Sequence, residues 1–213
     1  MRRELYTTGL QVREAPEGNR IEGYAIMFGV SSAPFVSNDD EEIREVIAPE
    51  AVTRELLDAS DIKMTMYHNR EKLLARSNRG EGTLSYGVDG DGVRFSFTVP
   101  DTQTGREALE LVRRGDIDGC SFAFTTDYRN RANVSRETTK ENGRSVTTYT
   151  VRKMSGIYDF TITPDPAYPA TTVAAREGDA DFAAFLKEER DADRAQREQE
   201  IRAQISEMRQ KIE

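Results

Sequence analysis

The chain has 213 residues and a formal net charge of −8, with one histidine and one cysteine. Its basic residues are mixed with acidic ones, and no stretch approaches the roughly 20 apolar residues of a membrane span, so we expect neither a nucleic-acid nor a membrane partner. One histidine and one cysteine are too few for a zinc site, and no glycine-rich nucleotide loop is present, so we expect no metal and no cofactor. The lone cysteine suits a reducing cytoplasm.

The first third of the chain is expected to form short strands and one helix. Ile21–Gly29 has the apolar pattern of a strand, whereas Ser31–Glu42 is acidic and rich in turn-forming residues, which predicts a loop. A short strand is expected at Glu45–Ile47. Pro49 then favours the first turn of a helix over Glu50–Asp58.

The middle of the chain has the residue pattern of β-structure. Candidate strands are Lys63–Asn69, Lys72–Ser77 and Thr83–Val88. The sequence DGDG at Asp89–Gly92 is a strong turn signal between two strands. From Val93 to Val99 apolar and polar residues alternate, which predicts a half-buried strand with one apolar face.

A helix is expected over Thr104–Arg114, with an apolar stripe on one side. Thr104 and Glu107 have the spacing of a capping box at its start. Gly115 stands where a helix commonly stops.

Strand patterns return after this helix, at Ile117–Thr125, Ser145–Met154 and Ile157–Thr163. The polar segment Arg129–Arg144 between them predicts a loop or the arm of a hairpin. The expected elements together make a mainly β chain with helices, of the α+β class.

The last segment, residues 177–213, is dominated by charged residues and contains no proline. Its apolar residues Ile201, Ile205, Met208 and Ile212 follow one stripe of a helix. We therefore expect a folded domain over residues 1–176 and a charged helical tail over residues 177–213. A solvated helix with a narrow docking seam and a scaffold-binding helix both fit this tail.

Ser121 lies in the strand sequence GCSFAF. Cys120, Phe122 and Phe124 share one face of the expected strand, and the aromatic face belongs in the core. Ser121 then points away from that core, beside the small Ala123, as a nucleophile requires. An ordinary strand serine is the simpler interpretation of this stretch alone. Cys120 is the competing nucleophile, because thiolates attack better than hydroxyls, but a buried cysteine more often acts as a small apolar residue.

His68 is the only histidine, so any imidazole chemistry in this chain must use it. An imidazole is the natural proton acceptor near neutral pH. The neighbours Asn69 and Arg70 are polar, and an ordinary surface histidine fits them as well.

Asp159 lies in the apolar strand sequence GIYDFTIT, where alternation places Ile157, Asp159 and Thr161 on one face. An acid inside such a strand is costly unless it is paired. The third member of a Ser-His-Asp triad has this character, since it accepts the Nδ1 proton of the histidine and fixes the tautomer. A surface-facing aspartate fits the same pattern.

Five segments, in this order along the chain, resemble the prohead serine protease family of tailed bacteriophages. They are GYAIMFG, EVIAPEAV, YHNREKLLARS, ALELVRRGDIDGCSFAF and YDFTITPDPAYPAT. They resemble an opening strand, a strand with a proline-led helix, a histidine motif, a helix ending in Gly-x-Ser, and a closing acidic motif. The resemblance covers residues 20–175, and the family is related in fold to the herpesvirus assembly proteases.

The resemblance implies a herpesvirus-protease-like β-barrel surrounded by short helices. It assigns the family's serine to Ser121, its histidine to His68 and its acidic third member to Asp159. Many relatives have Glu at the last place, and the herpesvirus relatives use a second histidine, which this chain lacks. The implied chemistry is acyl transfer, with backbone N–H groups around the oxyanion, for which Asp127–Gly143 is the candidate region.

The resemblance also implies a serine endopeptidase that is packed inside the immature prohead, in the cytoplasm of a bacterial host. Its expected substrates are a scaffold protein, the scaffold segment of the major capsid protein, and the protease itself. The expected partners are therefore the major capsid protein, the scaffold protein and a second copy of the chain. Two other interpretations stay open: a non-catalytic capsid scaffold or assembly module on the same barrel, and a cysteine hydrolase that uses Cys120.

Overall fold

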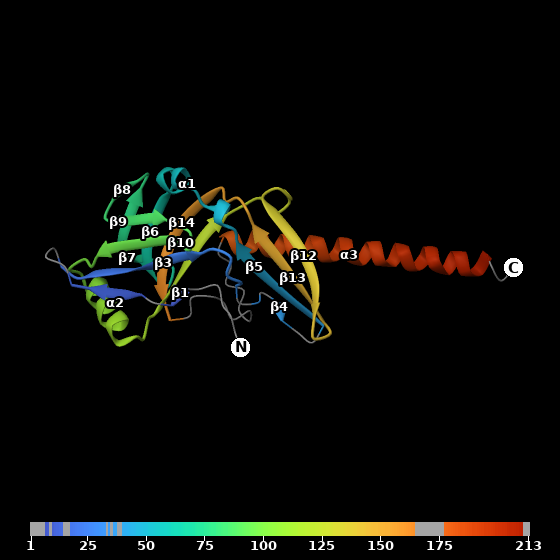
Figure 1. Cartoon of the computed structure of the whole chain (residues 1–213), viewed down its shortest axis with the longest axis horizontal. Coiled ribbons are helices and arrows are strands. Elements are labelled where there is room, and N and C mark those ends of the chain that lie inside the picture. The colour runs from blue at the N-terminus through green and yellow to red at the C-terminus, as the bar shows by residue number, and fades with distance from the viewer. Residues whose placement is uncertain are drawn as a thin grey trace. The chain divides into compact units, whose positions relative to one another are not determined.

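The computed structural model describes residues 7–8, 10–14, 18–32, 34, 36–37, 40–164 and 177–210. By its internal contacts the chain separates into two units, Met1–Val173 and Ala174–Glu213. Strands predominate in the described part of the first unit, with short helices between them, so the mixed α+β class is confirmed. Figure 1 labels the elements in chain order.

The described strands of the first unit belong to three sheets. The first sheet has the order β1 (Thr7–Thr8), β11 (Gly119–Thr125), β14 (Gly156–Thr163), β6 (Asp61–Met66), β7 (Asn69–Asn78) and β8 (Glu81–Gly82). The second has the order β2 (Gln11–Arg13), β3 (Arg20–Met27), β10 (Gly92–Thr98) and β9 (Leu84–Val88). The third has the order β12 (Val134–Glu141), β13 (Arg144–Val151), β5 (Glu41–Ile47) and β4 (Val36–Ser37).

The expected closed barrel is not formed by the strands that the structure describes. Each of the three sheets has two edge strands instead of closing on itself. The apolar faces are covered by stacking one sheet on another, as the rings of Phe95 in β10 and Phe160 in β14 show, with centroids 6.5 Å apart. Stacking buries the same kind of apolar face that a barrel encloses, so residue alternation alone does not distinguish the two.

The alternation expected for Val93–Val99 is confirmed in β10. Val93, Phe95 and Phe97 are buried, while Arg94 and Thr98 are exposed. The buried side chains of β10 belong to the core between the second sheet and the first sheet.

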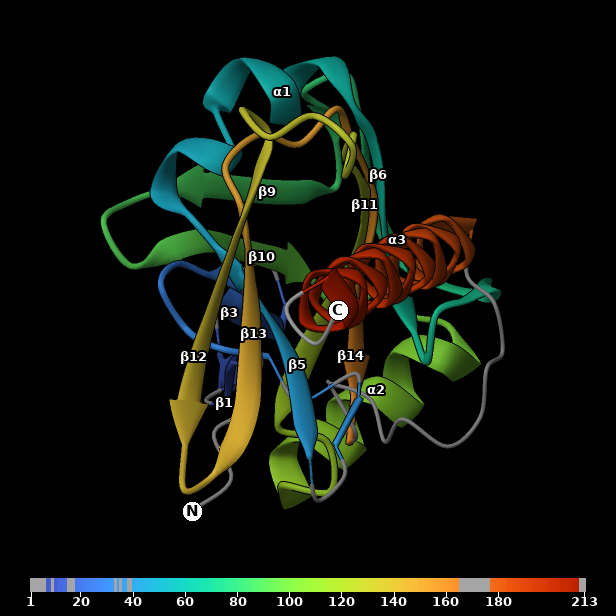
Figure 2. The same ribbon diagram turned by 90° about the vertical axis from the view of Figure 1, so that its right-hand side faces the viewer.

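Two strands occupy segments that the sequence assigned to loops. The loop expected over Ser31–Glu42 contains β4 and the start of β5. Half of Arg129–Arg144 forms β12, which makes an antiparallel hairpin with β13, so the hairpin arm is confirmed. β5 pairs in parallel with β13, and Figure 2 shows β12, β13 and β5 side by side. Because of these long-range pairings, segments whose local composition favours turns form strands.

The helix expected over Glu50–Asp58 is split in two. A short 3-10 helix, η1 (Pro49–Ala51), ends at Val52, and α1 (Arg54–Ala59) begins after a new cap. The cap is Thr53, whose Oγ1 accepts a hydrogen bond from the N–H of Leu56 at 3.2 Å. A threonine that satisfies a free N–H at this point starts a separate helix.

The second helix of the first unit, α2 (Gln103–Arg114), is capped two residues earlier than the expected capping box. Thr102 Oγ1 accepts from the N–H of Gly105 at 3.0 Å, so Thr102 is the cap and the Thr104–Glu107 box is wrong. Glu107 instead lies 3.2 Å from Lys72 Nζ. The stop at Gly115 is confirmed by its left-handed backbone, with φ 75°. Helices α1 and α2 lie at opposite ends of the first unit in both views (Figure 1, Figure 2).

The described part of the second unit is one helix, α3 (Glu177–Gln210), as the charged tail predicted. Ile201 of its expected apolar stripe is exposed, and Ile212 lies outside the described residues, as does the proline-rich end of the closing motif, residues 165–170. Among the helices of the described ranges, none is both long enough and apolar enough to cross a membrane.

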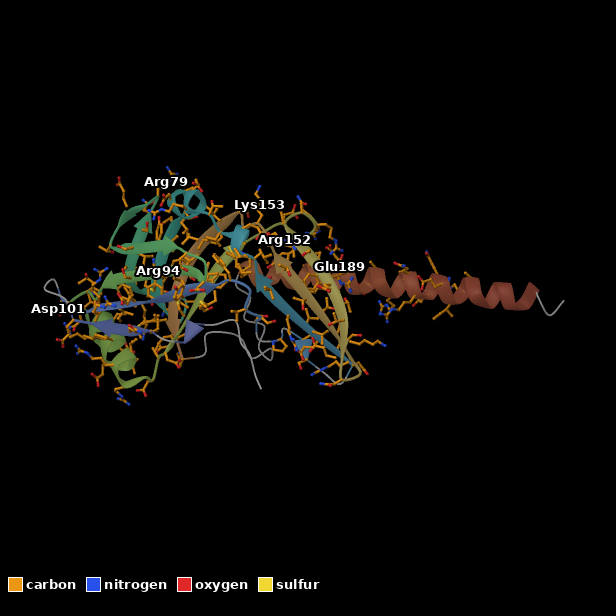
Figure 3. The ribbon with its side chains drawn as sticks, viewed as in Figure 1. Arg79, Arg94, Asp101, Arg152, Lys153 and Glu189 are labelled. Atoms are coloured by element: carbon orange, nitrogen blue, oxygen red, sulfur yellow. The ribbon has the colours of Figure 1, made fainter. Side chains whose placement is uncertain are left out.

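Arg94 and Arg152 are exposed charged residues at the surface of the first unit (Figure 3). Arg94 Nε lies 2.8 Å from Asp89 Oδ2, and Arg152 Nη1 lies 2.9 Å from Glu50 Oε1. The mixing of basic with acidic residues along the sequence therefore reappears as ion pairs on the surface.

Candidate active site

Three neighbouring strands of the first sheet, β11, β14 and β6, carry a polar face. Ser121 pairs with Thr161 across β11 and β14, and Thr161 pairs with Thr65 across β14 and β6. Directly paired residues point to the same side of a sheet, so these three hydroxyls share one face. Asp159 precedes Thr161 by two residues and lies on that face as well.

His68 occupies a strained two-residue turn at the end of β6. Tyr67 has φ 57° and His68 has φ 53°, and they join Met66 to its partner Asn69 at the start of β7. Two successive positive φ angles are typical of Asn-Gly turns. In residues with larger side chains they cost about 1–2 kcal/mol each. Strained backbone of this kind persists where surrounding contacts hold it, and it gathers at functional sites.

The turn is tied to β14 by two hydrogen bonds. The N–H of Tyr67 donates to the carbonyl of Ile162 at 3.2 Å. The N–H of His68 donates to the hydroxyl oxygen of Thr161 at 2.8 Å. The strand that carries Asp159 therefore also holds the backbone of His68.

The side chains of His68 and Asp159 are in hydrogen-bond contact, with Nδ1 and Oδ1 3.0 Å apart. They are only 12% and 14% exposed. An ionised carboxylate only accepts, so a neutral imidazole in this pair carries its proton on Nδ1 and leaves a lone pair on Nε2. His68 Nε2 is buried and has no partner among the described residues. An imidazole in this arrangement is oriented at one nitrogen and free to accept a proton at the other.

Lys63 lies opposite Asp159 in the ladder between β6 and β14. Its Nζ lies 2.8 Å from Asp61 Oδ2. Lys63 is therefore ion-paired with Asp61, and Asp159 contacts His68.

Ser121 is 7% exposed and lies across β14 from the His68 turn. Its Oγ has no hydrogen-bond partner among the described residues, so it does not bond His68 in this conformation. Paired residues have Cβ atoms about 4.5–5.5 Å apart. Ser121 therefore lies one strand spacing from Thr161, whose hydroxyl touches the backbone of His68. The structure brings His68 and Asp159 into contact and places Ser121 on the same face beside them.

Cys120, the competing nucleophile, points the other way. It pairs with Ile162 on the apolar face and is buried. Burial raises the pKa of the Cys120 thiol, which disfavours the thiolate that would be needed for attack. The opposite orientation of Cys120 and Ser121 agrees with the alternation expected from the sequence.

Two expectations for the faces of these strands need correction. A register shift between Ala123 and Phe124 sets Phe124 opposite Ile157, so the buried Ile157 does not share the face of Asp159. Tyr158 is displaced to the surface, where it is 48% exposed. Phe122 and Phe124, expected in the core, are only partly buried, and their ring centroids lie 5.5 Å apart. Alternation is lost at a β-bulge because the extra residue has no partner.

Thr161 and Thr65 were not among the residues selected from the sequence. Both are fully buried and hydrogen-bonded to each other through their hydroxyls at 3.0 Å. Each is a lone hydroxyl residue between apolar neighbours, in MTM and in FTI. A buried hydroxyl needs partners, so this pattern was the available signal.

The described ranges contain no group of three or more His, Cys, Asp or Glu side chains that could hold a metal ion. A family model described as caudovirus prohead serine protease matches residues 8–184, which include Ser121, His68 and Asp159. Comparison with curated proteins and with solved structures found no match.

Proposed function

This chain belongs to the caudovirus prohead serine protease family, and we propose that Ser121, His68 and Asp159 carry its peptidase activity. The family makes the chain a hydrolase of bacteriophage capsid maturation. The observation that carries the residue assignment is the 3.0 Å contact between His68 Nδ1 and Asp159 Oδ1. The same ring keeps Nε2 buried without a partner among the described residues, and Ser121 lies on the same face of the sheet.

The proposed reaction is acyl transfer in two steps. Ser121 Oγ attacks the carbonyl carbon of a peptide bond while His68 Nε2 takes the hydroxyl proton. The carbon–nitrogen bond breaks as His68 returns that proton to the leaving amine, and an ester with Ser121 remains. Water then attacks the ester, with His68 again as base. Asp159 stabilises the imidazolium through Nδ1, and backbone N–H groups stabilise the negatively charged oxygen.

The step that must occur first is formation of a hydrogen bond between Ser121 Oγ and His68 Nε2. Catalytic hydrogen bonds are often long in a protein without substrate and shorten when substrate binds. Rotation of the small serine side chain about one bond is enough to reorient Oγ on its face of β11. We therefore place formation of the Ser121–His68 hydrogen bond in the substrate complex.

The proposed substrates are a scaffold protein, the scaffold segment of the major capsid protein, and the chain itself, cleaved inside the prohead of a bacterial host. The family description supports action on capsid or scaffold proteins. Kinship with the herpesvirus assembly proteases is part of the same proposal, and it rests on the resemblance of the sequence motifs to the prohead protease family. In this chain we assign the third position to Asp159, which contacts His68, and the second histidine of the herpesvirus relatives is absent.

Co-expression with the capsid and scaffold proteins of the same phage tests the proposal. Wild type is expected to yield shortened capsid or scaffold protein on a gel, and Ser121→Ala to leave both at full length. Ser77→Ala is the matched control, since Ser77 is also a buried strand serine of the first sheet, with its hydroxyl 3.4 Å from Tyr86.

Cleavage that persists in Ser121→Ala contradicts the assignment of the nucleophile. Proheads that assemble normally with either chain, and without cleavage, support the non-catalytic scaffold instead. Intact masses of the purified chains test self-processing. If wild type and Ser121→Ala differ only by the mass of the oxygen atom that the substitution removes, self-processing is contradicted.

A further inference from the structure

The hydroxyl group of Thr161 makes three hydrogen bonds within the sheet. Its Oγ1 donates to the carbonyl of Thr65 at 3.1 Å and accepts from the hydroxyl of Thr65 at 3.0 Å. It also accepts from the backbone N–H of His68 at 2.8 Å. Thr161 and Thr65 are both completely buried, so no solvent can replace these contacts.

The neighbouring strand β7 contacts the turn through Lys72, whose Nζ lies 5.3 Å from the centroid of the Tyr67 ring, but its regular backbone pairing is interrupted there. Thr65 pairs with Leu73, but the next residue, Met66, already pairs with Asn69. Three residues of β7 therefore lie between two successive pairs, and the regular ladder is interrupted next to the turn. The bonds from Tyr67 and His68 to β14 described above therefore contribute to holding the positive φ angles.

Of these two bonds, only the one to His68 depends on a side chain. The bond from Tyr67 reaches a backbone carbonyl and survives any substitution in β14. We propose that Thr161, oriented by Thr65, is a positioning residue that fixes the backbone of His68 and thereby aims its imidazole at Asp159 and Ser121. This inference rests on the proposed function for its catalytic meaning, although the positioning itself is a structural claim.

Thr161 also ties the whole group together across the sheet. It is the residue opposite Ser121 on β11 and opposite Thr65 on β6, and it follows Asp159 by two positions on its own strand. A change in its hydroxyl thus alters the hold on His68 while leaving the pairing register of Ser121 and Asp159 intact. The substitution is therefore expected to misorient the imidazole of His68 and to leave substrate binding unchanged.

The test compares Thr161→Val, which keeps the branched shape and removes the hydroxyl, with Thr161→Ser, which keeps the hydroxyl. The control is Thr147→Val, because Thr147 is a buried strand threonine of the third sheet whose hydroxyl bonds Thr138 at 3.0 Å. In Thr161→Val, kcat is expected to fall about 10- to 100-fold with KM unchanged, as a misplaced catalytic group predicts. Thr161→Ser should recover most of the loss, and Thr147→Val should keep wild-type kinetics.

A second readout needs no substrate. His68 is the only histidine, so nitrogen-15 labelling of histidine gives the NMR signals of one imidazole. Wild type, Thr161→Ser and Thr147→Val should show a fixed Nδ1–H tautomer, and Thr161→Val should shift toward the signals of Asp159→Ala, in which the ring has lost its carboxylate.

A wild-type imidazole spectrum and wild-type kcat in Thr161→Val overturn the inference. So does a Thr161→Ser variant as impaired as Thr161→Val, because the hydroxyl then explains nothing. Should Thr161→Val fail to fold, Thr65→Val carries the test: a shifted imidazole spectrum supports the inference and an unchanged one overturns it. A wild-type chain that cleaves nothing contradicts the proposed function, while the spectra still decide the positioning.

Discussion

The two faces of the first sheet are built from alternate residues of the same strands, yet they hold very different side chains. One face carries Cys120, Phe160 and Ile162, which are all buried, and the ring of Phe160 packs against Phe95 of the second sheet. The other carries Ser121 and Thr161, buried as well, with Asp159 beside them. Both faces are largely shielded from water, so the difference between them is chemical rather than a matter of exposure.

Burial explains why the side chains of the polar face are hydrogen-bonded to one another. A buried polar group without a partner is costly, so burial forces pairing. Thr161 is satisfied by Thr65 and His68, and Asp159 contacts His68. His68 Nε2 is buried without a partner among the described residues, and Ser121 Oγ on the same face has none there either. An unpaired acceptor among paired groups marks the place where a proton from outside the network is received.

The comparison also separates two adjacent candidate nucleophiles. Cys120 and Ser121 are neighbours, but the strand points them to opposite faces. A slip of one residue in register would exchange them, and the apolar face fixes the register against that slip. The better intrinsic nucleophile is therefore placed in the core, where burial raises the pKa of its thiol.

The largest effect is expected from Asp159→Asn on the polar face. The amide leaves the size of the side chain unchanged but favours the wrong tautomer of His68, and the corresponding change in a Ser-His-Asp triad lowers kcat by about 10⁴. Steady-state kinetics on a scaffold-derived peptide measure it. An Asp159→Asn chain within tenfold of wild-type kcat contradicts a catalytic pairing with His68.

A large loss of stability, without a catalytic defect, is expected from Phe160→Ala on the apolar face. Phe160 is completely buried, and removing such a ring costs about 3–5 kcal/mol in the free energy of unfolding. Denaturant titration measures the loss, and kcat of the folded fraction should stay within a few fold of wild type. A much reduced kcat in folded Phe160→Ala would mean that the two faces are not separable.

The smallest effect is expected from Cys120→Ala. It removes one buried sulfur, which costs about 1 kcal/mol of stability, and it should leave peptidase activity intact. In wild type the thiol should react with iodoacetamide only after denaturation, because it is buried and its pKa is raised. Loss of activity in a folded Cys120→Ala chain would favour the cysteine hydrolase.

Local pattern predicted much of this fold. Three features follow from residues that are close together in the sequence. They are the alternation of β10, the end of α2 at Gly115 and the opposite faces of Cys120 and Ser121. The open stacking of sheets and the parallel pairing of β5 with β13 did not follow, since they join segments far apart in the chain.

The sequence named the candidate residues of the site, but it did not indicate the contacts that hold them. The family resemblance assigned Ser121, His68 and Asp159, whereas the residue pattern alone also fitted an ordinary strand serine, a surface histidine and a surface aspartate. The bulge that turns Ile157 to the other face leaves no mark in the residue pattern. The role of Thr161 depends on a contact with a turn 93 positions away in the chain, which one sequence does not reveal.

Reaction of the purified full chain with diisopropyl fluorophosphate, followed by peptide mapping, tests the central claim most directly. This reagent phosphorylates a serine only where a neighbouring base activates it. We predict one adduct, on Ser121, that is lost in Ser121→Ala and in His68→Ala and retained in Cys120→Ala. An adduct that survives in Ser121→Ala, or that forms equally well without His68, would contradict the account.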